Sequence, residues 1–132
     1  MEMELDYMKD VIIDETALDL EWLDQANLAA KYGKHWALCR KRLLEAEEKV
    51  KVIRAELVIE ANTDPRKCCN KDKPNAADIE AYYRNSKRHK KAKEEWLEAQ
   101  YECDMAEIAK NEISYTRKVA LENLVRLHAQ QY

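Results

Sequence analysis

The chain of 132 residues has very few of the residues that break or turn a backbone. It contains one glycine, Gly33, two prolines, Pro65 and Pro74, and no phenylalanine. Because turns between strands draw heavily on glycine, proline, asparagine and aspartate, this composition argues against a sheet protein. A single glycine also excludes a glycine-rich phosphate-binding loop. We therefore expect an all-α fold built from long helices.

The sequence also lacks the apolar segments that membranes and secretion require. It has no apolar run of about 18 residues, so nothing is expected to span a membrane. Residues 1–6 are acidic and do not have the pattern of a signal peptide. The four cysteines are Cys39, Cys68, Cys69 and Cys103. Without a secretory signal, we expect these thiols to be reduced and the protein to be cytoplasmic.

Most patterns that carry catalysis or bind metals are missing too. A di-iron bundle needs Glu-x-x-His pairs that face inward. The residues three positions before His35, His89 and His128 are Tyr32, Ser86 and Val125. Cys68 and Cys69 are adjacent, which is not the spacing of a zinc pair. We expect no metal, no cofactor and no catalytic residues.

One enzymatic alternative stays open. The pairs Glu45 with Glu48 and Glu95 with Glu98 have the Glu-x-x-Glu form by which all-α nucleotide pyrophosphatases hold magnesium. Acidic residues are so frequent in this chain that such pairs are expected by chance, and the residues between them suit solvated helix faces. A small nucleotide-hydrolysing enzyme therefore has less support than the two hypotheses that follow from the charge pattern and the apolar lines described below.

Positive charge is concentrated in one part of an otherwise acidic chain. The formal net charge is −3, and residues 1–24 hold one basic and nine acidic residues. Residues 62–93 hold ten basic and four acidic residues, and the densest run, residues 82–93, opens with two tyrosines. Basic side chains that neutralise phosphates release counterions, and tyrosine rings stack on unpaired bases. The run is either a nucleic-acid surface or a solvated helix face that keeps an oligomer soluble.

The pattern predicts a single helical domain over residues 1–132. Its expected parts are an acidic segment (1–15), a first helix (16–61), a basic loop (62–74) and a second helix (75–130). Thr16 with Asp19 fits a capping box, and Asn75 with Asp78 fits a second one. A short connection between two long helices predicts a long antiparallel, coiled-coil-like hairpin. Gly33 is a candidate kink within the first helix.

Each predicted helix has an apolar seam and a second apolar line. The first seam alternates spacings of four and three, which is typical of a coiled coil: Leu18, Trp22, Gln25, Ala29, Tyr32, Trp36, Cys39, Leu43, Ala46, Val50, Ile53 and Leu57. The second seam is Ala92, Trp96, Ala99, Cys103, Ala106, Lys110, Ile113, Arg117, Ala120, Leu124 and Leu127. The lines away from the seams are Tyr101, Ile108 and Tyr115, and Leu23, Ala30, Ala37, Leu44 and Val58.

A two-helix hairpin can bury only one face of each helix. Because large exposed apolar patches mark interaction sites, the second lines predict that the chain assembles into a homo-oligomer. The alternative is a chain that kinks near Gly33 and folds back on itself.

The candidate nucleic-acid-binding residues are Arg54, Arg66, Lys67, Lys71, Lys73, Tyr82, Arg84, Lys87, Arg88, Lys90 and Lys91. In a continuous helix, Arg84, Lys87, Arg88 and Lys91 would line one side. Tyr82 is the candidate ring for stacking, whereas Tyr83 is equally compatible with packing on the first helix. No helix-turn-helix spacing is visible, so a single strand is favoured over a duplex, whose readers insert a helix into the groove.

The opening of the chain resembles a known family. The run is Lys9-Asp10-Val11-Ile12-Ile13-Asp14-Glu15-Thr16-Ala17-Leu18. It resembles the Lys-Asp-Val-hydrophobic-Ile-Asp-x-Thr-x-Leu start of the UvsY-like recombination mediators of tailed phages. The likeness extends loosely over about the first 60 residues. Arg54, Ala55 and Leu57 match the family's hydrophobic-basic-Ala-Arg-Leu motif, in which Glu56 replaces the second basic residue, so the resemblance does not carry that part of the DNA contact.

The resemblance implies a non-catalytic mediator of DNA recombination and repair. Members of the family are small, helical, ring-like homo-oligomers that bind single-stranded DNA. They help a RecA-like recombinase displace the single-strand-binding protein, so both proteins are the implied partners, and the host bacterial cytoplasm is the implied location for a bacteriophage protein. The rival hypothesis is a structural coiled-coil adaptor that has no nucleic-acid role.

Overall fold

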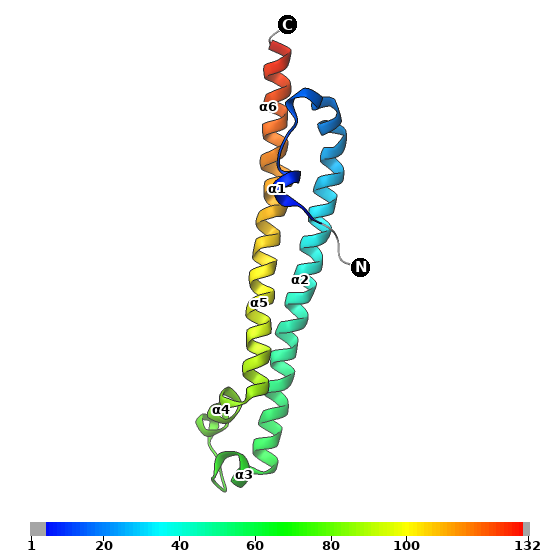
Figure 1. Cartoon of the computed structure of the whole chain (residues 1–132). Coiled ribbons are helices and arrows are strands. Elements are labelled where there is room, and N and C mark those ends of the chain that lie inside the picture. Colours follow the sequence, from blue (N-terminus) through cyan, green and yellow to red (C-terminus); the bar gives the residue numbers. More distant parts are fainter. Residues whose placement is uncertain (1–4, 131–132) are drawn as a thin grey trace. The chain divides into compact units, whose positions relative to one another are not determined.

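The computed structural model describes residues 5–130, and every regular element in that range is helical (Figure 1). The all-α prediction is therefore confirmed for the described residues. The elements in chain order are α1 (Tyr7–Asp10), the 3₁₀ turn η1 (Glu15–Ala17), α2 (Leu18–Thr63), α3 (Pro65–Cys69), α4 (Ala76–Asn85), α5 (Lys87–Asn111), the π-helical turn η2 (Glu112–Thr116) and α6 (Arg117–Gln130). Residues 1–4 of the predicted acidic segment and residues 131–132 lie outside the described part.

The chain folds as two compact units. The first unit comprises the residues up to Arg40 and those from Glu102 onward, and the second unit is Lys41–Tyr101. The single helical domain expected from the sequence stays a prediction, and so does assembly into a homo-oligomer. None of the described helices is both long and apolar enough to cross a membrane.

In the second unit, α2 and α5 run antiparallel. Lys49 Nζ of α2 lies 2.8 Å from Glu95 Oε2 of α5, and Glu56 of α2 pairs with Arg88 of α5. Residue numbers therefore rise along α2 as they fall along α5, which is the pairing that the sequence predicts. Val50, Leu57 and Ala92 are buried in this unit, and all three lie on predicted seams.

The first unit has a buried polar network around Arg117. The Arg117 side chain is 1% exposed, and its Nη2 lies 2.5 Å from Glu21 Oε2 of α2. Arg117 also donates to Gln25 Oε1 at 2.6 Å and to the carbonyl oxygen of Asp10 at 2.8 Å. Gln25 in turn donates to the carbonyl oxygen of Ile113. Two of the polar residues on the predicted seams, Gln25 and Arg117, thus partner each other.

The segment before α2 is held on the first unit by apolar and polar contacts. Leu5, Tyr7, Val11 and Ala109 pack on a cluster of Leu28, Tyr32 and Ile113. The Tyr32 hydroxyl donates to Asp10 Oδ2 at 2.8 Å, and Lys31 Nζ lies 3.2 Å from the same oxygen. Burial and the Asp10 carboxylate raise the pKa of Tyr32. Asp10 and Val11 belong to the run that carries the family resemblance.

Helix α2 begins two residues later than predicted. Asp14 caps the 3₁₀ turn η1 that leads into α2, because its Oδ1 accepts from Thr16 N at 2.9 Å and from Thr16 Oγ1 at 2.6 Å. These bonds lower the pKa of Asp14. The helix then continues unbroken through Gly33 to Thr63. The alternative of a chain that folds back near Gly33 is therefore wrong.

The predicted loop 62–74 contains a short helix, so that part of the prediction is wrong. Asp64 accepts from Lys67 N, Pro65 occupies the first helical turn, and α3 ends at Asn70 with φ 55°. Proline is preorganised for the start of a helix, and asparagine tolerates the left-handed conformation that ends one. A complete five-residue helix therefore lies inside a segment for which the composition predicted only a loop.

The predicted second helix, 75–130, is not continuous. The capping box of Asn75 and Asp78 is confirmed. The helix stops at Asn85, because Ser86 is extended with ψ 132°, and α5 begins at Lys87. Figure 1 draws α4 and α5 as separate helices. Serine favours helix ends, which is consistent with a helix end at this position.

The seam of the second helix shifts at the π-helical turn. Ile113 and Arg117 are buried as predicted, but the next buried residue is Leu121, at 0% exposure, whereas Ala120 is exposed. A π turn inserts one extra residue into the helix, and one residue corresponds to about 100° of rotation. The predicted seam residue Leu127 is therefore exposed. The prediction continues the alternating spacing of four and three residues through this turn, so it does not include the inserted residue.

The second apolar lines are exposed, as expected from their place away from the seams, except for Val58, which is half-buried. Tyr101, Ile108 and Tyr115 are 60%, 56% and 71% exposed, and Leu23 is 75% exposed. Leu44 of the same line is also exposed. These side chains lie on outer helix faces that no described residue covers.

Candidate nucleic-acid interface

All the candidate residues fall in the second unit. Arg54 is on α2, Arg66 and Lys67 are on α3, Lys71 and Lys73 follow α3, Tyr82 and Arg84 are on α4, and Lys87, Arg88, Lys90 and Lys91 begin α5. They come from four helices and one link, and the fold gathers them into one compact part of the chain. Their role in binding stays a prediction.

The predicted single strip of Arg84, Lys87, Arg88 and Lys91 does not form on one helix. The break at Ser86 places Arg84 on α4 and leaves the other three on α5. Arg84 Nε lies 2.8 Å from Glu80 Oε1, one turn earlier on α4. The four residues have helical spacing in the sequence, but they lie on two separate helices.

Several of the basic side chains already have acidic partners. Arg88 pairs with Glu56 and lies 3.4 Å from Glu60 Oε1. Glu56 thus contacts the strip directly. Arg66 Nε lies 3.5 Å from Asp72, and Lys71 Nζ lies 3.0 Å from Asp78. The pairs of Arg88 and Arg66 are exposed and contribute little to stability, whereas Asp78 is half-buried and also caps α4.

Three exposed lysines gather at the start of α5. Lys87, Lys90 and Lys91 form no ion pair within 4 Å among residues 5–130, although the charge of Lys91 contributes to lowering the pKa of Glu95. The first turn of α5 contains no acidic residue. Because the N-terminus of a helix is the positive end of its dipole, the lysine charges and the dipole add here. This surface, the α5 lysine cluster, is the most strongly cationic part of the candidate interface.

His89 adds no charge to this cluster. It is 6% exposed, and its Nε2 has no hydrogen-bond partner within the described residues. Burial and the neighbouring cations Arg54 and Lys93 lower the pKa of His89. The imidazole is therefore neutral at neutral pH. The basic run is thus cationic on its outer side and neutral where it meets the core.

The two tyrosines have different surroundings. The Tyr83 ring packs on α2 through Arg54, whose Cζ lies 5.6 Å from its centroid, and on His89 at 5.3 Å. Tyr83 is therefore a packing residue, the alternative that the sequence left open. The Tyr82 hydroxyl donates to Glu60 Oε2 at 2.9 Å. Hydrogen bonds to Cys68 and Glu60, with burial, raise the pKa of Tyr82.

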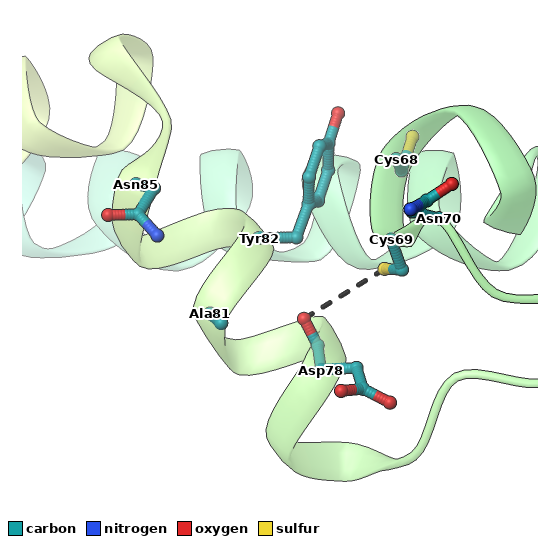
Figure 2. Close-up of a pocket in the computed structure, with 7 residues that line it drawn as sticks. All are labelled: Cys68, Cys69, Asn70, Asp78, Ala81, Tyr82 and Asn85. Atoms are coloured by element: carbon teal, nitrogen blue, oxygen red, sulfur yellow. Dashed lines mark hydrogen bonds between the residues drawn. The ribbon is translucent and has the colours of Figure 1, made fainter.

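Tyr82 lines an open pocket of about 370 Å³ (Figure 2). The pocket is bounded by the end of α3 and one side of α4, and its other lining residues are Cys68, Cys69, Asn70, Asp78, Ala81 and Asn85. Cys69 Sγ lies 3.9 Å from the Asp78 carbonyl oxygen, and Cys68 Sγ lies 3.6 Å from that of Glu60. Burial, Cys68 and Asp78 raise the pKa of the Cys69 thiol.

Sequence reasoning missed Asn70 and Asn85 as site residues. Asn70 shows a signal only as a helix-ending residue, and Asn85 shows none, because its place on the pocket depends on the break at Ser86. Within the described residues, neither side-chain amide forms a hydrogen bond with the protein. No group of three or more His, Cys, Asp or Glu side chains in residues 5–130 is arranged to hold a metal ion.

Comparison with known proteins identifies no relative. No protein-family model matches the chain, no curated protein matches its sequence, and no solved structure matches its fold.

Proposed function

We propose that this protein is a recombination mediator that binds single-stranded DNA through its second unit. The observation that carries the proposal is the α5 lysine cluster, which lies on the same compact unit as an open pocket lined by an aromatic ring. Lysines that neutralise phosphates supply most of the affinity for a nucleic acid in a sequence-independent way. An aromatic ring adds stacking that only unpaired bases can accept.

A single strand suits this surface better than a duplex. Readers of duplex DNA insert a helix or ribbon into the major groove and contact base edges with a few side chains. In the second unit, the basic residues are spread over α2, α3, α4 and the start of α5. A flexible strand can follow such a dispersed set of charges, whereas a rigid duplex contacts only part of it.

The mediator role rests on the resemblance at residues 9–18. It also agrees with the expectation from the sequence that the chain has no catalytic residues. Binding by one subunit is expected to be weak, and a homo-oligomer would raise the overall affinity because several subunits hold one strand. The exposed lines of Tyr101, Ile108, Tyr115 and Leu23 are the surfaces that such an assembly would bury. The bound strand would then be presented to a RecA-like recombinase in place of the single-strand-binding protein.

The test is a triple substitution of the α5 lysine cluster, Lys87, Lys90 and Lys91 to Ala. Each phosphate contact to a single strand contributes about 0.7 to the slope of log K against log salt concentration. The triple variant should therefore lose about 2 from that slope, together with most of its affinity at low salt. Fluorescence anisotropy of a labelled oligodeoxythymidine measures both quantities.

The matched control replaces three exposed lysines of the first unit, Lys9, Lys34 and Lys118, with Ala. This variant has the same change in net charge, so a general electrostatic effect would weaken both proteins equally. Retained binding in the control and lost binding in the cluster variant support the proposal. Unchanged binding by the cluster variant would refute it.

A structural adaptor without a nucleic-acid role is the second candidate. It is favoured by the exposed apolar lines, which require a protein partner but no DNA. It predicts that the wild-type protein assembles in solution and yet gives no anisotropy change with any oligonucleotide at low salt. Mass measurement with and without single-stranded DNA separates the two candidates.

A further inference from the structure

The pocket beside Tyr82 has the size of a small-molecule site, and it combines one aromatic ring with several polar side chains. Its volume of about 370 Å³ lies within the range of about 300–1,000 Å³ that is typical of such sites. The aromatic ring of Tyr82, two asparagines, two cysteines, Asp78 and Ala81 line it, and the Asp78 carboxylate is paired with Lys71. A flat, polar-edged molecule matches this lining better than an aliphatic one, because the ring offers a stacking face and the amides offer hydrogen bonds.

The Tyr82 ring is fixed in place before any ligand binds. Its hydroxyl donates to Glu60 on α2, so the ring is anchored at its far end while its face borders the pocket (Figure 2). Glu60 also pairs with Arg88, which holds the carboxylate that anchors the hydroxyl. A preorganised ring loses little conformational entropy when a base stacks on it.

The two pocket amides flank this ring and are free to bind. Figure 2 shows Asn85 on one side of Tyr82 and Asn70 on the other. Asn85 is the last residue of α4 and Asn70 follows α3, and both side chains are exposed. An asparagine amide can donate to one atom and accept from its neighbour, which is the pairing made with N7 and N6 of adenine.

Cations for the flanking phosphates lie close along the chain. Lys71 follows Asn70 directly, and its Nζ is held by Asp78, another pocket residue. Lys87 lies two residues after Asn85. Lys71 is thus held at a residue of the pocket, and Lys87 follows the pocket residue Asn85 closely in the chain.

We propose that the pocket binds one unpaired base of the DNA strand, with adenine preferred. The base stacks on Tyr82, and both Asn70 and Asn85 hydrogen-bond to it. This inference rests on the proposed function, because it names the part of the strand that the second unit recognises. It adds a preference for base identity to a surface that otherwise reads only phosphates.

The test compares three 12-nucleotide strands of equal charge: oligodeoxyadenosine, oligodeoxythymidine and an abasic strand. Stacking contributes on the order of tenfold or more in affinity per base. The wild-type protein should therefore bind oligodeoxyadenosine at least about tenfold more tightly than the abasic strand, with oligodeoxythymidine in between. Equal affinity for all three strands would overturn the base pocket while leaving the phosphate-binding surface of the proposed function intact.

Two substitutions locate the effect. Asn85→Ala and Asn70→Gly should each reduce the preference for adenine and leave the abasic strand bound as before. Glycine is chosen at position 70 because the backbone there is left-handed. The control is Asn111→Ala, an exposed asparagine at the end of α5. A full adenine preference in the double variant N70G/N85A would also overturn the proposal.

A separate measurement covers the case in which no strand binds at all, which would refute the proposed function. Titration of the ¹⁵N-labelled protein with deoxyadenosine monophosphate should shift the side-chain amide signals of Asn70 and Asn85. Selective shifts of these signals support the pocket independently of strand binding. Unmoved signals at millimolar nucleotide overturn it.

Discussion

The two units use arginine in opposite ways. In the first unit, Arg117 is 1% exposed and donates to Glu21, Gln25 and the backbone of the segment before α2. In the second unit, Arg88 is about half exposed and pairs with Glu56 and Glu60 at the surface. The buried arginine holds elements together, whereas the exposed arginine leaves its charge accessible to a ligand.

The two units also differ in their net charge. The first unit contains eight basic and fourteen acidic residues, and the second contains fifteen basic and twelve acidic residues. The first unit buries an arginine and presents an acidic surface. The second unit buries a neutral histidine and presents its cations. The net charge is therefore negative in the first unit and positive in the second.

The largest test of this comparison is removal of Arg117. Breaking a buried ion pair leaves its partner uncompensated and typically costs about 3–5 kcal/mol. We therefore expect Arg117→Ala to lower the free energy of unfolding by about that amount, measured by urea denaturation followed by circular dichroism. Arg126→Ala, at an exposed position of α6, is the control and should change little. A loss below about 1 kcal/mol would contradict the assigned role.

A gain of stability is expected at Gly33. Glycine within a helix costs about 1 kcal/mol relative to alanine. A Cβ at position 33 would have no atom within 4 Å, so Gly33→Ala should stabilise the protein by about 1 kcal/mol in the same denaturation experiment. Destabilisation would show that α2 needs glycine at this point for a contact that the described residues do not make.

Removal of Arg88 should have a small effect on stability. Exposed ion pairs contribute about 0.2–1 kcal/mol, so Arg88→Ala should reduce the free energy of unfolding by less than about 1 kcal/mol. The difference between the losses of unfolding free energy in Arg88→Ala and Arg117→Ala measures how much burial increases the contribution of an arginine ion pair. Equal losses at the two positions would remove the distinction.

The smallest expected effect is a dependence of stability on pH that originates at His89. Burial lowers the pKa of His89 in the folded protein, whereas in the unfolded chain it titrates near about 6.5. The unfolded state then binds more protons at acidic pH, so this contribution is complete above about pH 6.5 and is lost as pH falls through the folded pKa. Urea denaturation at pH 7.5 and pH 5.5 measures the slope.

His89→Leu should flatten this pH dependence, because leucine has no proton to bind. His128→Ala, on α6, is the control and should retain the slope of the wild-type protein. An unchanged slope in His89→Leu would assign the pH dependence to other groups.

Much of the fold follows from periodicity and local chemistry. The scarcity of glycine and proline indicates helices, the spacing of four and three places Tyr32, Cys39, Val50 and Leu57 in the core, and the capping box at Asn75 begins α4 where expected. These features depend on residues close together in the chain, so the sequence alone contains the information.

The remaining features depend on partners distant in sequence. Whether Arg88 is free or paired depends on Glu56 and Glu60, some thirty residues earlier, and whether Arg117 is buried or exposed depends on Glu21 and Gln25. No local pattern specifies these contacts.

The amino-acid sequence by itself determined that the chain is helical, where its seams begin and where its positive charge is concentrated, because these properties arise from neighbours within a few turns. Only the tertiary structure decided that the basic run divides at Ser86, that the π-helical turn rotates the last seam, and that Tyr82 meets Asn70 and Asn85 at one pocket. Those outcomes depend on contacts between segments that are distant in the sequence, and such contacts become defined only when the helices pack.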